Sequence, residues 1–288
     1  MSAPPRLFDR GLHRKRLDRA APGYAAADFL KRRAAQDIAE RLEPIMRNFA
    51  VAVDLGARNG SFREALSRSE AAGRVGMLIE TDLSAAMLAG RPGPRLVADE
   101  ERLPFADASL DLAVSTLALH WTNDVIGALI QIRRALKPDR LFIGAFLGGT
   151  TLTELRQSLV AAEAEILGGA GSRVSPFADA ADAAGLLTRA GFVQPVADVD
   201  RVTVTYAHPL KLLADLRQMG ETNVLAERHP RPLTRTLLAR ACEIYAERFG
   251  GPDGRTAASF EILTITGWTP PAGDPVPAPS PRLKRRIR

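Results

Sequence analysis

The sequence predicts an α/β fold in which a mostly parallel sheet is covered by helices on both faces. The chain has 288 residues, of which 46% are hydrophobic and 25% charged, so it can bury a sizeable core. From position 50 onward, short apolar runs rich in β-branched residues alternate with segments of helical spacing. Parallel strands need crossover connections, which place helices on both faces of the sheet. We therefore expect a doubly wound domain.

The individual elements follow this alternation in order. Apolar residues recur at helical spacing over 24–46, which predicts one or two amphipathic helices. A helix over 124–136 is expected to end before Pro138, because proline cannot continue a helix. The predicted strands are 50–54, 75–81, 95–98, 110–115, 141–147, 196–206 and 260–268. The other predicted helices are 62–67, 85–89, 150–167, 182–190, 209–219 and 233–249.

Composition divides the chain into three parts. Residues 1–48 are predicted to form a helical extension, and residues 49–269 the α/β domain. Residues 270–288 are rich in proline and end in a basic cluster. Repeated proline blocks helix formation and removes sheet donors, so we expect this tail to be disordered.

The net charge of +6 comes from the two ends of the chain. Residues 1–19 and 270–288 each carry +4, and the body between them carries −2. Basic ends are typical of solvated tails, although they also attract anionic lipid, nucleic acid or an acidic partner. The nearly neutral body argues against nucleic-acid binding, and the tail predicts peripheral contact with an anionic membrane.

Other features exclude several classes of protein. The single cysteine, Cys242, excludes an intrachain disulfide and a cysteine-cluster zinc site. No run reaches the roughly 18 apolar residues that a bilayer span requires. The histidines lack the spacing of metal ligands, so the sequence predicts no metal site. These histidines are His13, His120, His208 and His229.

A glycine-containing turn follows the first predicted strand. Its sequence is Asp54-Leu55-Gly56-Ala57-Arg58-Asn59-Gly60. Open α/β sheets bind ligands at the carboxyl ends of their strands, and glycine lets the backbone approach a ligand closely. Taken alone, the same pattern also suits an ordinary strand-to-helix turn. Asp54 is predicted either to contact an amino group of a ligand or to cap the next helix.

Acidic residues follow the second and third predicted strands. Asp82 precedes Leu83 and lies roughly 20 residues beyond the glycines, a spacing that suits a carboxylate bound to ribose hydroxyls. Its other interpretation is an N-cap of the next helix. Asp99 and the adjacent Glu100 lie where they could meet an adenine edge, or be part of a solvated loop.

The order of these blocks resembles that of the class I S-adenosylmethionine-dependent methyltransferases. The resemblance implies a seven-stranded sheet with an antiparallel last strand, and S-adenosylmethionine as cofactor. The blocks are Asp54-Leu55-Gly56, Asp82-Leu83-Ser84, Asp99-Glu100-Glu101-Arg102-Leu103-Pro104-Phe105 and Leu110-Asp111-Leu112-Ala113-Val114-Ser115. The cofactor-binding residues implied are Asp54, Gly56, Arg58, Gly60, Asp82, Leu83, Asp99 and Glu100.

A narrower resemblance extends over nearly the whole chain. The blocks at 8–10, 119–124, 148–156 and 219–223 are similar to those of the mitochondrial complex I assembly factor 5 family. In that family the methyltransferase-like fold is associated with hydroxylation of an arginine on the quinone-proximal iron–sulfur subunit, which is the implied partner. Because the match begins almost at Met1, we expect a bacterial, cytoplasmic protein without a transit peptide.

Arg58 departs from the family pattern, which usually has a second glycine at this place. Its long side chain could obstruct the methionine end of the cofactor, turn outward, or pair with the cofactor carboxylate. We expect binding that survives but is weakened.

Candidate substrate residues follow the fourth predicted strand and lie on a later helix. His120 is a candidate base or a hydrogen-bonded structural histidine, and Trp121 a pocket wall or a core residue. Glu154 and Arg156 belong either to a substrate contact or to a solvated helix start.

The first functional hypothesis is an enzyme that binds S-adenosylmethionine and acts on a methyl acceptor or a protein arginine. Methyl transfer needs mainly orientation, so few catalytic groups need be visible in the sequence. One alternative is a small-molecule or acyl-carrier-protein methyltransferase, whose family shares fewer of the later blocks. The other is a non-catalytic assembly scaffold, which the altered glycine loop favours.

Overall fold

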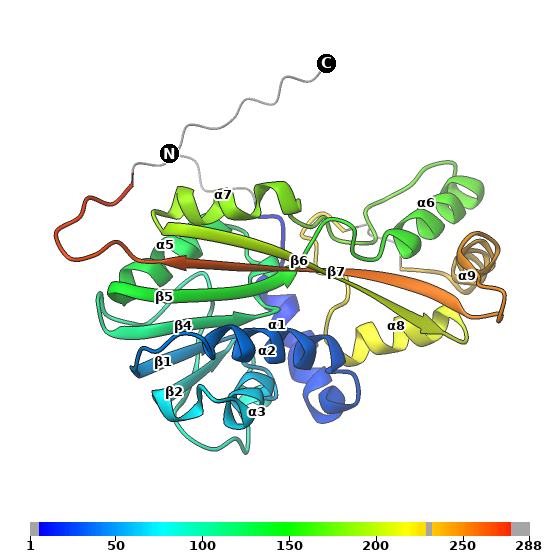
Figure 1. Ribbon diagram of the computed structural model, residues 1–288. Coiled ribbons are helices and arrows are strands. Elements are labelled where there is room, and N and C mark those ends of the chain that lie inside the picture. The colour runs from blue at the N-terminus through cyan, green and yellow to red at the C-terminus, as the bar shows by residue number, and fades with distance from the viewer. Residues whose placement is uncertain (1–5, 229–231, 278–288) are drawn as a thin grey trace.

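A seven-stranded sheet in the order β3-β2-β1-β4-β5-β7-β6 forms the centre of the molecule (Figure 1). The computed structural model describes residues 6–228 and 232–277, without the side chains of 180 and 181. Strand β7 runs antiparallel to both of its neighbours, and the remaining pairs are parallel, which confirms the predicted fold. The strands are β1 (Phe49–Leu55), β2 (Val75–Asp82), β3 (Arg95–Val97), β4 (Leu110–Thr116), β5 (Leu136–Leu147), β6 (Val193–Tyr206) and β7 (Thr256–Trp268).

Each helix predicted from the alternation is present, with small shifts at its ends. The α-helices are α1 (Arg10–Ala20), α2 (Phe29–Leu42), α3 (Ser61–Arg68), α4 (Ala85–Leu88), α5 (Val125–Ala135), α6 (Thr153–Leu167), α7 (Ala180–Ala190), α8 (Pro209–Gln218) and α9 (Arg235–Phe249). Short 3₁₀ helices are η1 (Ala21–Ala26), η2 (Ala72–Arg74) and η3 (Leu119–Trp121). Helix α2 and η1 account for the predicted amphipathic stretch.

The central strands are buried on both faces, because successive side chains point to opposite faces and helices cover each face. Leu112 and Ile143 belong to the core that includes α2 and α3, whereas Ala113 and Phe142 belong to the core that includes α5 and α7. Helices α6, α8 and α9 form a lobe at the end of the sheet toward which β4 and β5 point (Figure 1). That lobe therefore lies beyond the carboxyl ends of the parallel strands.

The start of β5 differs from the prediction. The strand begins at Leu136 rather than at position 141, so it includes Pro138. Pairing with β4 shifts register between Leu110 and Leu112. An irregularity of this kind accommodates proline, which has no N–H to give to the sheet.

The interpretation of residues 10–19 as part of a solvated basic end is wrong. They form α1, whose N-terminus is capped by Asp9, where Oδ1 accepts a 2.9 Å hydrogen bond from the Leu12 nitrogen. His13 and Leu17 are buried on the inner side of the helix. Cations at most other positions conceal the apolar periodicity, so the sequence predicted a helical extension over 1–48 without the bounds of this helix.

The residues that follow β7 stay paired with the start of β5. The Pro270 carbonyl accepts a 3.2 Å hydrogen bond from the Asp139 nitrogen. The predicted disordered tail falls largely on residues 278–288, which lie outside the described residues. Within the described ranges, no helix has both the length and the apolar character needed to cross a bilayer. The division at position 48 stays a prediction.

Candidate functional site

The loop after β1 has two glycines whose conformations other residues would strain. Gly56 has φ +69°, and a Cβ there would lie 2.3 Å from the Ala118 Cβ in the segment after β4. Gly60 has φ +74°, and a Cβ there would overlap the guanidinium of Arg91. Glycine tolerates both the left-handed backbone and the close approach. The loop is therefore held against its neighbours by contacts that leave no room for a side chain.

Arg58, between these glycines, points into the protein. Its side chain is 1% exposed, and its Nη1 lies 2.8 Å from Oδ2 of Asp82, whose side chain is fully buried. The backbone nitrogen of Arg58 donates to the same oxygen at 2.9 Å, and Oδ1 accepts from the Ser84 nitrogen at 2.8 Å. The N-cap of α4 is Ser84, not Asp82. The Asp82 carboxylate is thus engaged by the chain itself.

A second arginine covers the next acidic pair. Arg10, at the start of α1, places Nη2 2.6 Å from Oδ1 of Asp99 and also pairs with Glu100. Its Nη1 donates to the Trp121 carbonyl at 3.2 Å. Helix α1 is therefore attached by its first residue to the segment that follows β3 and to the segment that follows β4.

Asp54 has a different environment from the other carboxylates. It is fully buried, and neither of its carboxylate oxygens has a hydrogen-bond partner among the described residues, so it does not cap α3. Burial raises the pKa of Asp54, and the charge of Lys31 opposes this shift. Burial lowers the pKa of Lys31, whose Nζ donates to the Gly56 carbonyl at 2.7 Å and to the Thr116 carbonyl. The Asp54 carboxyl is thus buried without a hydrogen bond from the described part of the chain.

The fit of S-adenosylmethionine can be judged from these contacts. The free oxygens of Asp54 and the close backbone approach at Gly56 suit such a cofactor. The carboxylates of Asp82, Asp99 and Glu100 are held by arginines instead. Leu83 packs among the residues beneath α1. In this arrangement Asp54 and Gly56 fit the cofactor, whereas the occupied carboxylates of Asp82, Asp99 and Glu100 do not.

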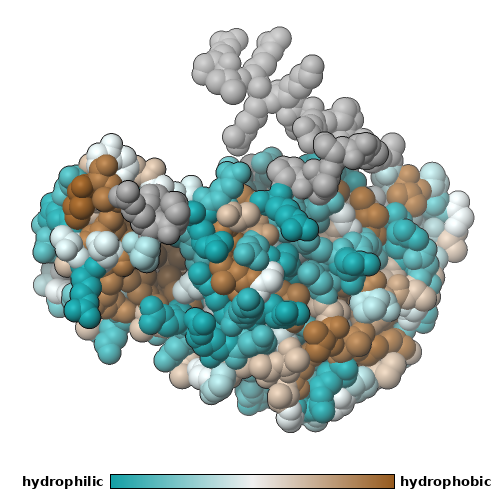
Figure 2. Space-filling view, turned by 180° about the vertical axis from the view of Figure 1, so that it is seen from behind, coloured by the Kyte–Doolittle hydropathy of each residue, from teal (hydrophilic) through white to brown (hydrophobic). Residues whose placement is uncertain are grey.

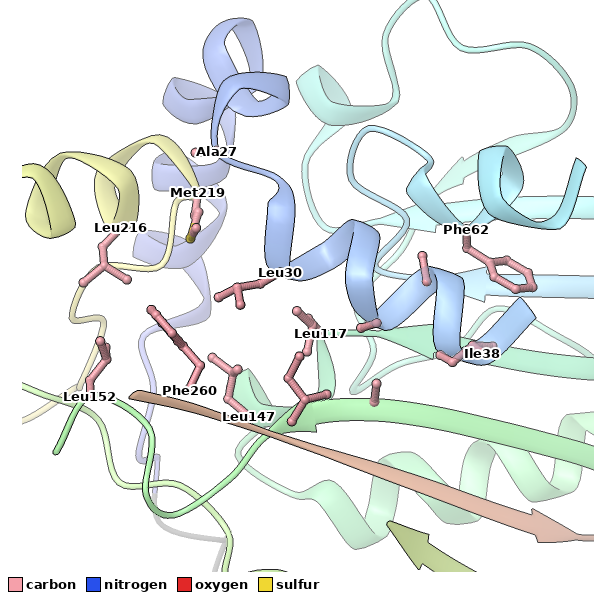
Figure 3. Close-up of a cluster of buried hydrophobic side chains, with 14 of the residues drawn as sticks. Ala27, Leu30, Ile38, Phe62, Leu117, Leu147, Leu152, Leu216, Met219 and Phe260 are labelled. Atoms are coloured by element: carbon pink, nitrogen blue, oxygen red, sulfur yellow. The ribbon is translucent and has the colours of Figure 1, made fainter. Parts of the chain in front are cut away.

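A cavity of about 480 Å³ lies beside these strand ends. Its walls are mostly apolar and come from α2, α6, α8 and the ends of β4 and β5. Figure 3 shows several of these side chains pointing toward one another from different elements. Figure 2 shows hydrophobic side chains in the hollow beside the lobe of α6, α8 and α9. The apolar wall includes Leu30, Leu117, Leu147, Leu152, Leu216, Met219 and Phe260. None of the eight predicted cofactor residues lines the cavity.

Polar groups meet at one part of the cavity wall. Oε2 of Glu221 accepts a 2.5 Å hydrogen bond from Nε1 of Trp121 and lies 3.3 Å from Nε2 of His120. Nδ1 of His120 has no partner among the described residues. His120 and Trp121 both line the cavity, and they contact a carboxylate that sequence reasoning did not assign.

Glu221 and Lys31 were missed for different reasons. Glu221 belongs to the block 219–223, but it follows α8 and is remote in sequence from His120. The block itself was the available signal, because it is part of the narrower family resemblance. Lys31 lies on α2 among other charged residues, so its burial could not be read from the sequence.

Glu154 and Arg156 lie at the start of α6 but are half-buried rather than fully solvated. Glu154 accepts hydrogen bonds from the backbone nitrogen and hydroxyl of Ser259, at 3.1 and 2.5 Å. Arg156 donates to the Ser175 carbonyl at 3.0 Å. Leu155, between them, lines the cavity while neither of them does. Both residues hold the cavity wall in place.

Comparison with known proteins places the chain in a family. A methyltransferase domain model matches residues 53–144. The arginine-hydroxylase NDUFAF5 of Danio rerio is 39% identical over 279 residues, which cover 94% of this chain and 85% of that protein. A malonyl-[acyl-carrier protein] O-methyltransferase of Halorhodospira halophila is 35% identical over 269 residues, covering 91% of this chain and 88% of that protein.

Solved structures agree on the fold. The YcgJ protein of Bacillus subtilis has a TM-score of 0.55 and 14% identity, covering 82% of this chain and 98% of that one. Identity at this level supports the fold alone. The strand order, the domain match and the full-length relatives together show that the chain belongs to the methyltransferase-fold enzyme family that includes the arginine-hydroxylase NDUFAF5.

Proposed function

We propose that this chain is an enzyme that modifies an arginine side chain of a partner protein. The observation that carries the proposal is the Glu221 carboxylate, which Trp121 holds in the wall of a mostly apolar cavity. An arginine side chain combines an apolar stem with a planar cation that binds carboxylates. The stem would contact the leucine walls, and the guanidinium would donate to Glu221. The names of the arginine-hydroxylase relatives support the same substrate.

Two neighbours prepare Glu221 for this role. Trp121 holds one carboxylate oxygen by a direct hydrogen bond, which orients the group toward a single position. His120 lines the cavity and keeps Nδ1 without a partner among the described residues, so it is the residue that we assign to hold or move a proton. Glu221 is accordingly a substrate-binding residue and Trp121 a positioning residue.

We further propose that the partner is an iron–sulfur subunit of respiratory complex I and that modification accompanies assembly. This proposal rests on the sequence blocks shared with the assembly-factor family. A cytoplasmic location, with contact between the basic tail and the membrane surface, would bring the enzyme to its partner.

Mass spectrometry of that subunit tests the proposal. In cells that supply molecular oxygen and a two-electron reductant, co-expression with the unaltered protein is expected to convert one C–H bond of a single arginine to C–OH, with water as the other product. Glu221→Gln is expected to abolish this gain of one oxygen atom. Added methylene units would instead indicate methyl transfer. A subunit that carries the same modification in a strain lacking this chain would refute the enzymatic role, and defective assembly of a normally modified complex would support a scaffold.

A second candidate, methyl transfer to an acyl group on a carrier protein, is favoured by one observation. A cavity of about 340 Å³ is lined by Arg16, Arg19, Arg217 and Thr222, and it shares Arg16 and Thr222 with the apolar cavity. Clustered arginines suit an anionic carrier. Transfer of a labelled methyl group from S-adenosylmethionine to a malonyl carrier protein would support this candidate.

A further inference from the structure

Arg58 combines two energetically unfavourable features. A fully buried ion pair requires the desolvation of both charges, which its own attraction only partly offsets. The residue also has φ +52°, a left-handed conformation that strains residues other than glycine. Such a combination persists only where the surrounding structure holds it in place. The position of the guanidinium therefore calls for a functional explanation.

The guanidinium lies among the residues predicted to hold the cofactor. Its Nη1 is 2.8 Å from Oδ2 of Asp82 and 3.6 Å from the position of a Cβ built on Gly56. The same Cβ position is 3.2 Å from Oε1 of Glu100. Asp82, Gly56 and Glu100 thus surround one end of the Arg58 side chain. A ribose on Asp82 would have to replace this end.

Arg10 occupies the acidic residues beside Arg58, in the region predicted to bind the cofactor. It pairs with both Asp99 and Glu100, so the two arginines together engage three carboxylates. Nε and Nη2 of Arg58 are buried and have no hydrogen-bond partner among the described residues. Asp82 consequently supplies the only hydrogen bond to this guanidinium within the described part of the chain.

We propose that Arg58 and Arg10 are built-in occupants of the cofactor region and that this chain folds and acts without S-adenosylmethionine. The guanidinium of Arg58 occupies the place of a ribose on Asp82. Arg10 forms ion pairs with Asp99 and Glu100, which would otherwise be free to bind the cofactor. Arginine modification by this chain is then not methyl transfer. The proposal concerns the cofactor and holds whichever substrate enters the apolar cavity.

Calorimetric titration of the full chain with S-adenosylmethionine and S-adenosylhomocysteine tests the proposal. The unaltered protein is expected to show no binding up to about millimolar ligand. Arg58→Gly removes the occupant and restores the glycine of the family pattern, so a gain of affinity of about tenfold or more is expected. Adding Asp82→Ala to this variant is expected to abolish the gain, because the ribose then lacks its acceptor.

Arg68→Gly is the matched control. Arg68 ends α3, its side chain is 71% exposed, and it pairs with Glu64 on the same helix. This substitution also introduces glycine but leaves the cofactor region intact, so no binding is expected.

Micromolar binding by the unaltered protein, with little change in Arg58→Gly, would overturn the proposal. If Arg58→Gly does not fold, two other measurements test the proposal. They are the affinity of Arg10→Ala for S-adenosylmethionine, which is expected to rise, and the thermal shift of the unaltered protein with S-adenosylhomocysteine. A ligand-dependent rise in melting temperature of the unaltered protein would contradict the proposal. Because these readouts measure binding, failure to modify an arginine would not affect them.

Discussion

Nε1 of Trp121 donates a 2.5 Å hydrogen bond to Oε2 of Glu221, although 100 residues separate the two in sequence. The bond joins the segment after β4 to the segment after α8, and it crosses the wall of the apolar cavity. It therefore fixes a carboxylate in a cavity wall whose other charged residues are Asp28 and the cations Arg16, Lys31, Arg173 and Arg228.

Glu221→Gln is expected to weaken binding of an arginine-containing substrate peptide by about tenfold or more. The amide keeps the shape and an oxygen acceptor for Trp121, but it removes the charge that strengthens hydrogen bonds to a guanidinium. The measurement is peptide affinity, together with the split between KM and kcat. Glu227→Gln alters an exposed carboxylate nearby and serves as the control. Equal affinities in the two variants would exclude Glu221 as the substrate-binding group.

Gly56→Ala is expected to destabilise the protein more than Gly90→Ala. Both glycines have φ +69°, so both substitutions carry a similar backbone strain of about 1–3 kcal/mol. Only at Gly56 would the new Cβ meet Ala118, at 2.3 Å, whereas nothing lies within 4 Å of a Cβ at Gly90. Overpacking adds about 1–3 kcal/mol. Urea unfolding measures the difference, and equal losses would mean that the loop after β1 moves freely.

His13 is expected to make the protein sensitive to acid. Burial, with the charges of Arg58 and Arg10, lowers the pKa of His13 well below 6.5. Below pH 6.5 the unfolded chain therefore binds a proton that the folded protein does not. The free energy of unfolding is therefore unaffected by His13 above this pH, and it falls by up to about 1.4 kcal/mol per pH unit below it.

His13→Phe keeps a ring beside Trp121, whose centroid lies 5.0 Å from that of His13, and removes the titration. Urea unfolding at pH 8 and at about pH 5.5 is expected to show a smaller acid loss in the variant than in the unaltered protein. The same acid loss in both proteins would show that His13 does not carry the effect.

Arg10→Ala is expected to loosen α1. Without this residue, Asp99 and the buried Glu100 lose their cation, and the helix loses its attachment to the Trp121 carbonyl. Limited trypsin digestion is expected to cut within α1 faster than in the unaltered protein. Arg14→Ala, at an exposed position on the same helix, is expected to have little effect on the rest of α1. Similar digestion rates for both variants would argue against a special role for Arg10.

Deletion of residues 270–288 is expected to weaken binding to vesicles that contain anionic lipid. Each lysine or arginine near such a surface contributes about 1 kcal/mol, and the deleted segment carries +4. Sedimentation with the vesicles at low and moderate salt measures the loss, and neutral vesicles are the control. Equal binding by the truncated protein would dismiss the membrane contact.

Local patterns determined most of the architecture. Alternating apolar runs predicted the strands and helices, because burial on both faces requires continuous apolar strands. They predicted a helical extension over 1–48 but not the bounds of α1, since its inner positions are filled by His13 and Leu17 among cations. They also placed the start of β5 too late, because the register shift beside Pro138 depends on its pairing with β4.

The sequence by itself determined the fold, the strand-end location of the candidate residues and the family, since each depends on periodicity or on blocks of neighbouring residues. Tertiary structure alone decided what these residues contact. The direction of Arg58, the attachment of Arg10 to Asp99 and the meeting of Trp121 with Glu221 join segments remote in sequence. Their geometry depends on crossovers and packing, and pairing of this kind leaves no regular spacing along the chain.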